Sequence, residues 1–185
     1  RRRDVCALTL LGPADQVREL AASEGLDLSG ITVINPATSG MRDDFAREYQ
    51  QLRAKKGVTL EEANERMLQG AYFGTMMVKL GRVDGMVSGA AHTTANTIRP
   101  ALEFIRTREN VQIVSSVFLM LLQDRVLVYG DCAVNPEPDA GQLADIALAS
   151  AATAEQFGIT PRVGMLSDST GASGKGDSVE KVREA

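Results

Sequence analysis

The sequence predicts an α/β fold, because short apolar stretches alternate with longer segments in which apolar residues recur at helical spacing. Three expected strands, at residues 83–87, 125–129 and 162–166, are each followed by a turn rich in small and polar residues. In open α/β sheets a ligand binds outside the carboxyl ends of the strands. The simplest arrangement is therefore one cleft that all three turns line.

The composition favours a globular protein and excludes a general affinity for nucleic acid. The 185 residues suffice for one domain or two small ones, and 44% of them are hydrophobic. Only 4% are aromatic and Trp is absent, so we expect an aliphatic core. A net charge of −4 and a sequence pI of about 5.1 provide no basic field for nucleic acid. Any anion site must therefore be local.

The cysteines and the chain ends bear on the compartment and on the length of the protein. Cys6 and Cys132 are too few and too far apart for a disulfide framework or a metal cluster, which favours free thiols in a reducing, cytoplasmic compartment. The arginines at residues 1–3 only faintly resemble a signal peptide, because Asp4 interrupts the pattern. No apolar stretch is long enough to span a bilayer. The chain does not begin with Met and ends within an apparent helix, so we expect a fragment of a larger protein.

Capping and breaking residues delimit the elements of the first half. Thr59 and Glu62 have the spacing of a capping box, and Gly25, Gly57 and Gly81 each follow a helical pattern and end it. The expected strands cover residues 5–11 and 31–34, and the expected helices cover residues 14–24, 42–56 and about 60–80.

Arg53 has two interpretations. It shares the last turn of helix 42–56 with Lys55 and Lys56, where cations complement the helix dipole. Alternatively, Arg53 leaves the surface to hold a phosphate group of a ligand.

Residues 83–105 are typical of a short buried strand, a small-residue loop and a helix. The loop lacks side-chain bulk, so a ligand can approach its backbone closely, and Pro100 suits the first helical turn. A helix start attracts anions, and Arg99 adds a forked donor. We expect a phosphate-bearing ligand here, with an ordinary strand–helix connection as the alternative. The single histidine suits a structural hydrogen bond as well as a ligand contact. The candidate binding residues are Ser88, Gly89, His92, Thr93, Thr97 and Arg99.

The second half begins with an expected hairpin, because only a short polar break separates strand 112–122 from strand 125–129. Asp131 and Asn135 follow in an irregular loop, where they either bind a ligand or form the turn. A long alanine-rich helix is expected at residues 140–157.

The last turn, at residues 167–177, follows the expected strand 162–166 and precedes the final helix. It departs from a Walker A loop at both ends, so its N–H and hydroxyl groups give only a weak signal for an anion site. Its candidate residues are Ser169, Thr170 and Gly171, and the alternative is a surface linker.

Four motifs together resemble the phosphate acetyltransferases, also called phosphotransacetylases. They read Y-Q-Q-L-R-A-K-K-G-V-T-L-E-E-A at 49–63, V-D-G-M-V-S-G-A-A-H-T-T-A-N-T-I-R-P-A-L at 83–102, V-Y-G-D-C-A-V-N-P at 128–136 and L-S-D-S-T-G-A-S-G-K-G at 166–176. The resemblance extends over nearly the whole chain. Its S-G-A-A-H and T-I-R-P blocks are specific to that enzyme and its acyl relatives.

The resemblance implies two three-layer α/β domains that flank a cleft, as in isocitrate and isopropylmalate dehydrogenases. Residues 1–108 are then expected to form part of the first domain and residues 109–185 part of the second. The implied reaction is acetyl-CoA + phosphate ⇌ CoA + acetyl phosphate, with coenzyme A as a substrate and no tightly bound cofactor or metal. The resemblance also implies small-molecule partners, a homo-oligomer, and no nucleic acid or membrane.

The resemblance assigns roles to single residues. The arginines of the family's L-R-x-x-K-G and T-I-R-P motifs fall on Arg53 and Arg99, and both are associated with CoA binding and activity. Asp168 stands where the family usually has an aromatic residue, which puts packing or cleft polarity in doubt. The family's catalytic serine, arginine and aspartate lie in an N-D-L-S-R-G segment that this chain lacks. We therefore expect substrate-binding residues, no catalytic ones, and no turnover by these 185 residues alone.

Two other functions stay open. A phosphate butyryltransferase differs in the volume of its acyl pocket. A non-catalytic domain that senses CoA esters, like the phosphotransacetylase-like tail of some malic enzymes, binds the same ligand without turnover.

Overall fold

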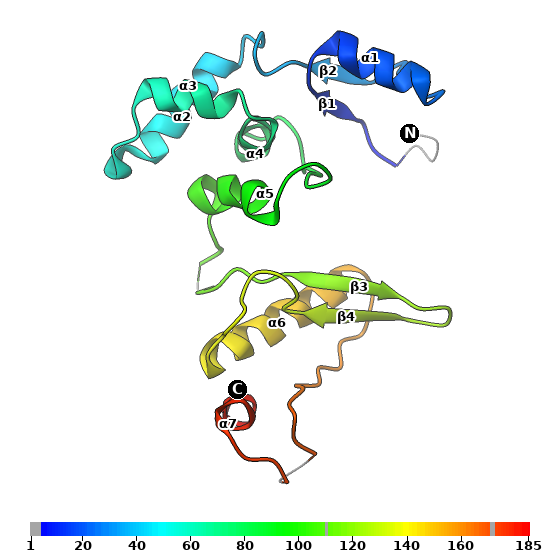
Figure 1. The fold of residues 1–185 in the computed structure, drawn as a ribbon, viewed down its shortest axis with the longest axis vertical. Coiled ribbons are helices and arrows are strands. Elements are labelled where there is room, and N and C mark those ends of the chain that lie inside the picture. The colour runs from blue at the N-terminus through cyan, green and yellow to red at the C-terminus, as the bar shows by residue number, and fades with distance from the viewer. Residues whose placement is uncertain (1–4, 110, 171–172) are drawn as a thin grey trace. The chain divides into compact units, whose positions relative to one another are not determined.

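The computed structural model describes residues 5–109, 111–170 and 173–185. The chain divides into two compact units, Arg1–Arg106 (unit 1) and Thr107–Ala185 (unit 2). Each unit combines helices with a two-stranded sheet (Figure 1), so the α/β class is confirmed.

Unit 1 begins with two short parallel strands. β1 (Thr9–Leu11) pairs with β2 (Thr32–Ile34), and α1 (Ala14–Ser23) connects them. Gly25, with φ of 63°, follows the end of α1, as its sequence position predicts. β1 is shorter than the expected strand 5–11, because only its last three residues are in register with β2.

Three further helices form the core of unit 1: α2 (Arg42–Leu52), α3 (Leu60–Met67) and α4 (Gly70–Lys79). Five of the chain's eight Phe and Tyr residues gather in this core, so the expectation of an aliphatic core is wrong for unit 1. Few aromatic residues suffice here because they pack on one another, as in the 4.9 Å separation of the Phe45 and Phe73 rings. The buried cluster is Phe45, Ala46, Tyr49, Ala63, Met67, Tyr72, Phe73, Met76, Met77 and Phe104.

The helices of this core are shorter than the sequence suggests. The capping box of Thr59 and Glu62 is confirmed at the start of α3. The expected continuous helix to residue 80 is wrong, because Gln69 adopts an extended backbone and a new helix begins at Gly70. Helix 42–56 likewise ends at Leu52, and the tight turn η1 (Ala54–Lys56) follows it.

The expected buried strand at residues 83–87 is wrong. These residues have no strand partner among the described residues, and the Val87 side chain is fully exposed. What anchors this segment is Met86, whose Sδ lies 2.6 Å from the position that a Cβ on Gly74 of α4 would occupy. An apolar run forms a strand only where a neighbouring strand also supplies hydrogen-bonding partners.

A helix follows this loop and changes its geometry at proline. α5 (Thr94–Pro100) begins after Thr93, whose Oγ1 accepts a hydrogen bond from Asn96 N at 3.3 Å. Pro100 ends α5 rather than opening it, so its expected place in the first turn is wrong. Its missing N–H interrupts the helical ladder, and the wider π-helical turn η2 (Ala101–Ile105) continues the chain.

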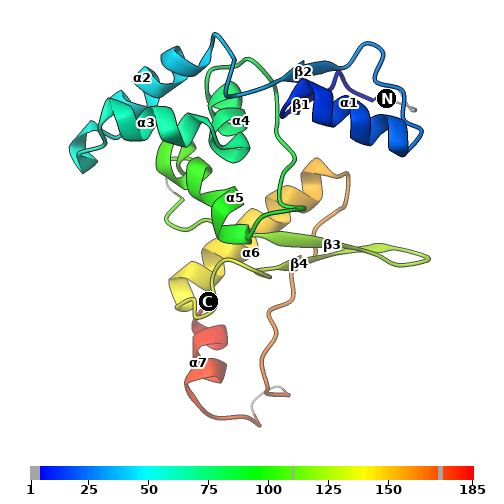
Figure 2. The same cartoon turned by 45° about the horizontal axis from the view of Figure 1, so that its top comes forward.

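Unit 2 consists of a hairpin, a long helix and a short terminal helix. β3 (Val117–Leu121) pairs antiparallel with β4 (Val126–Gly130), which confirms the hairpin although β3 begins later than expected. α6 (Ala140–Gln156) lies beside β4 (Figure 2), where Ser150 fills the space next to Gly130. Gly130 therefore allows the close approach of helix and strand.

The end of unit 2 departs from expectation. Residues 162–166 form no strand, and Leu166 is 90% exposed. Among the residues described here no third strand lies beside β3 and β4, so this apolar segment has no ladder to join. The final helix, α7 (Asp177–Glu184), forms as expected. Within the described parts of the chain, no helix combines the length and apolarity needed to cross a membrane.

Candidate functional site

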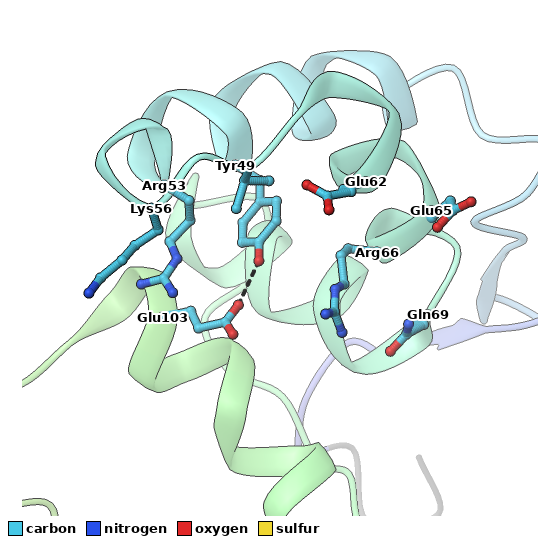
Figure 3. Close-up of a pocket in the computed structure, with 9 residues that line it drawn as sticks. Tyr49, Arg53, Lys56, Glu62, Glu65, Arg66, Gln69 and Glu103 are labelled. Atoms are coloured by element: carbon cyan, nitrogen blue, oxygen red, sulfur yellow. Dashed lines mark hydrogen bonds between the residues drawn. The ribbon is translucent and has the colours of Figure 1, made fainter.

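Three cations and three carboxylates line a cavity of about 380 Å³ in unit 1 (Figure 3). Its walls come from the end of α2, the turn after it, helix α3 and the π-helical turn η2. Cations and carboxylates both face it. The lining residues are Tyr49, Arg53, Lys56, Val58, Glu62, Glu65, Arg66, Gln69 and Glu103.

Two tyrosines hold one carboxylate in this wall. Tyr49 Oη donates a hydrogen bond to Glu103 Oε2 at 2.7 Å, and Tyr72 Oη donates to the same oxygen at 3.1 Å. Burial and then the hydrogen bond to Glu103 raise the pKa of Tyr49 far above its ordinary value. Burial and the nearby Glu103 charge also raise the pKa of Tyr72. Both hydroxyls therefore stay protonated and serve as donors.

The cations of the cavity differ in how they are held. The Arg66 guanidinium lies over the Tyr72 ring, 5.3 Å from its centroid, which is a cation–π geometry. Arg53 caps the C-terminus of α2, and its Nε is buried without a hydrogen-bond partner. A buried guanidinium N–H without a partner is costly, and the same guanidinium lines the cavity, where its fork suits an anionic ligand.

A second cavity of unit 1, of about 270 Å³, gathers four of the candidates from residues 83–105. Ser88, Gly89, His92 and Thr97 line it together with Thr94 and Ile98. Gly89 has φ of 115°, which an L side chain rarely adopts, and its ideal Cβ position lies 3.7 Å from Thr97 Oγ1. The loop thus turns its backbone toward α5 at a place where only glycine fits without strain.

The other two candidates of that stretch lie outside this cavity. Thr93 caps α5 through its side chain, so its hydroxyl has a structural task. Arg99 is exposed on α5, and its charge lowers the pKa of Tyr72 against the larger effect of burial. Arg99 therefore has a small electrostatic effect on Tyr72.

Asp131 and Asn135 come together in unit 2, in the loop after β4. The Asp131 carboxylate accepts from Ser116 N at 3.1 Å, from Ser116 Oγ, and from Asn135 N and Nδ2 at 2.6 Å each. Burial raises the pKa of this carboxyl, but the hydrogen bonds from Ser116, Ala133 and Asn135 outweigh burial and leave it well below the ordinary value. These contacts form the loop, and a ligand contact of either residue stays a prediction.

The candidates of the last turn have local partners as well. Ser169 Oγ accepts a hydrogen bond from Gly174 N at 2.8 Å, and the Thr170 carbonyl accepts from Ser173 Oγ at 2.8 Å. Gly171 lies outside the described residues. A ligand role for this turn therefore also stays a prediction.

Sequence reasoning missed several groups of the first cavity. The sequence predicts for Lys56 only an interaction with the helix dipole, and it predicts no role for Arg66, Gln69 or Glu103. The one available signal was a glutamate inside an otherwise apolar helical run, A-L-E-F-I at 101–105, because a charge in such a run needs a partner. Among the described residues, no three His, Cys, Asp or Glu side chains lie together as a metal site requires.

The chain is similar to named proteins over almost its whole length. It is 55% identical over 184 residues to a phosphate acetyltransferase of Nitratidesulfovibrio vulgaris, a match that covers 100% of this chain and 26% of that protein. It is 49% identical over 183 residues to a phosphate acetyltransferase of Corynebacterium glutamicum, covering 99% of this chain and 56% of that protein.

A solved structure is also similar. The EutD phosphotransacetylase from Staphylococcus aureus has a TM-score of 0.85 and 45% sequence identity, and the match covers 96% of this chain and 54% of that chain. The chain thus spans between about a quarter and about half of the length of these relatives. The family described as phosphate acetyl/butaryl transferase matches residues 1–185. The chain therefore belongs to the phosphate acetyl/butaryl transferase family.

Proposed function

We propose that this protein transfers an acetyl group reversibly between coenzyme A and inorganic phosphate. The observation that carries this proposal is the cavity that Arg53, Lys56 and Arg66 line together. Such a site suits the phosphate groups of coenzyme A or acetyl phosphate. The names of the relatives, which match most of this chain, support the acetyl enzyme.

The reaction that we propose is an acyl transfer without a redox step. The CoA sulfur, as thiolate, attacks the carbonyl carbon of acetyl phosphate, the carbon–oxygen bond to phosphate breaks, and phosphate leaves with the electron pair. The thiol proton passes to a base outside the described residues. Arg53 and Arg99 are proposed to bind CoA or phosphate, and Ser88, Gly89, His92 and Thr97 are proposed to line the second part of the substrate site.

The remaining expectations of the sequence belong to the same proposal. Residues 1–108 and 109–185 are proposed as parts of two three-layer domains of the isocitrate dehydrogenase type. Binding roles for Thr93, Asp131, Asn135 and the turn at 169–171 stay predictions. The same holds for a shared cleft, a homo-oligomer, a cytoplasmic location and the absence of a tightly bound cofactor.

A thioester assay tests the proposal. Full-length protein with CoA and acetyl phosphate, and with no redox cofactor, should form acetyl-CoA, seen as a rise in thioester absorbance. Turnover with butyryl phosphate but not with acetyl phosphate would instead favour phosphate butyryltransferase. CoA binding in a calorimeter without turnover of either acyl phosphate would favour the CoA-sensing domain.

A further inference from the structure

Glu103 joins three helical segments of unit 1. It lies on η2 and accepts hydrogen bonds from Tyr49 on α2 and from Tyr72 on α4, at 2.7 and 3.1 Å. Tyr49 is 54 positions away from Glu103 in the sequence. One oxygen thus ties together elements that no local pattern connects.

The rings of the two tyrosines are fixed by packing. Their centroids lie 5.7 Å apart at an interplanar angle of 80°, and the Tyr49 ring meets Phe104 edge-on at 5.6 Å. Tyr49, Tyr72 and Phe104 are each almost fully buried. Rings held in edge-to-face contact have little freedom, so their hydroxyls hold the carboxylate in one place.

This network lies between the two groups of substrate-binding candidates. Arg53 follows Tyr49 by one helical turn, and Arg53 N donates to Tyr49 O at 3.0 Å. On the other side, η2 continues directly from α5, which carries Thr97 and Arg99. In Figure 3 the Arg53 guanidinium points toward Glu103, and both groups line the same cavity.

We infer that Glu103 is a positioning residue, which holds η2 against α2 and α4 and thereby places Arg53, one helical turn after Tyr49, so that the cavity receives an anionic group of CoA. This inference rests on the proposed function. Glu103 contributes through geometry, because its own charge repels an anion. If Glu103 positions the site, removing its charge should raise KM for CoA. If Glu103 only repels the ligand, removing its charge should lower KM for CoA.

The test compares two neutral variants of full-length protein. Glu103→Gln keeps the size and one acceptor oxygen, but it weakens both tyrosine hydrogen bonds because the acceptor is no longer charged. Glu65→Gln is the matched control, because it removes a carboxylate from the wall of the same cavity, and Glu65 has no hydrogen bond to the tyrosines. KM for CoA, kcat and the melting temperature are measured for each.

We expect Glu103→Gln to raise KM for CoA about tenfold, while kcat changes by less than about threefold. Glu65→Gln should leave KM for CoA equal or lower, because one repulsive charge is gone. Tyr49→Phe and Tyr72→Phe should each raise KM for CoA by a smaller factor, since one of the two bonds that hold Glu103 remains. If Glu103→Gln does not fold, Tyr49→Phe decides by the same KM measurement.

Four outcomes overturn the inference. A lower KM for CoA in Glu103→Gln, as in the control, makes Glu103 a repulsive charge only. A lower melting temperature with unchanged KM for CoA would show that the network stabilises the fold but does not position the binding site. An active wild type with unchanged KM in every variant refutes the inference alone, whereas a wild type that forms no thioester refutes the proposed function and the inference with it.

Discussion

Glu103 in unit 1 and Asp131 in unit 2 are both carboxylates that accept several hydrogen bonds, but their partners differ. Those of Glu103 are side-chain hydroxyls from two distant helices, and its cavity is open to a ligand. Those of Asp131 are mainly backbone N–H groups of the next few residues, together with Ser116. The same chemical group therefore joins helices around a site in one unit and shapes a single loop in the other.

Replacing Asp131 should give the largest loss of stability. Hydrogen bonds to a charged group contribute about 1.5–3 kcal/mol each, and Asp131→Ala removes several, so we expect the free energy of unfolding to fall by about 3 kcal/mol. Urea unfolding followed by circular dichroism measures this loss. Ser116→Ala removes one donor and should cost less. An Asp131→Ala protein as stable as wild type would show that the loop does not depend on its carboxylate.

Arg53 tests the ligand role of the cavity in unit 1. Arg53→Ala should raise KM for CoA about ten- to hundredfold, which matches a loss of about 1.5–3 kcal/mol for a charged hydrogen bond. Arg53→Lys should recover only part of this, because an ammonium lacks the planar fork. Arg47→Ala is the matched control, since Arg47 is exposed on the same helix and bonds to Asp44. Steady-state kinetics of the three variants decide, and equal KM values would return Arg53 to a role at the helix terminus.

The pH dependence of stability should distinguish the two carboxylates further. The pKa of Asp131 is lower in the folded protein than the ordinary value of 3.8. Its stabilisation is therefore complete above the unfolded pKa and is lost as pH falls through the folded pKa. The difference in unfolding free energy between wild type and Asp131→Asn should shrink from about pH 6 to about pH 2. A difference that stays constant over this range would mean that ionisation of Asp131 does not stabilise the loop.

The two capping boxes should show the smallest effects and no difference between the units. Thr59 and Asp139 each accept a hydrogen bond from a backbone N–H three residues later, at the starts of α3 and α6. Thr59→Ala and Asp139→Ala should each cost about 1 kcal/mol, because both caps are exposed and local. Thermal unfolding measures both. If Asp139→Ala lowered the free energy of unfolding as much as Asp131→Ala, the many hydrogen bonds of Asp131 would give it no special role in the stability of unit 2.

Local chemistry was readable from the sequence. The Thr59 capping box, the Gly25 helix end and the β3–β4 hairpin depend on residues within a few positions of one another, and each forms as predicted. The candidates Ser88, Gly89, His92 and Thr97 gather at one cavity for the same reason, since one short loop and helix carry them.

The tertiary structure decided what depends on distant partners. Residues 83–87 and 162–166 are apolar enough for strands, but a strand also needs a neighbour, and among the described residues none pairs with them. Glu103 has no partner within its own helix, and its role in the cavity follows only from the packing of Tyr49 and Tyr72 beside it. Hydrogen bonds between residues 31 and 54 positions apart depend on how the helices pack, so the local sequence indicates that Glu103 needs a partner but not which residues supply it.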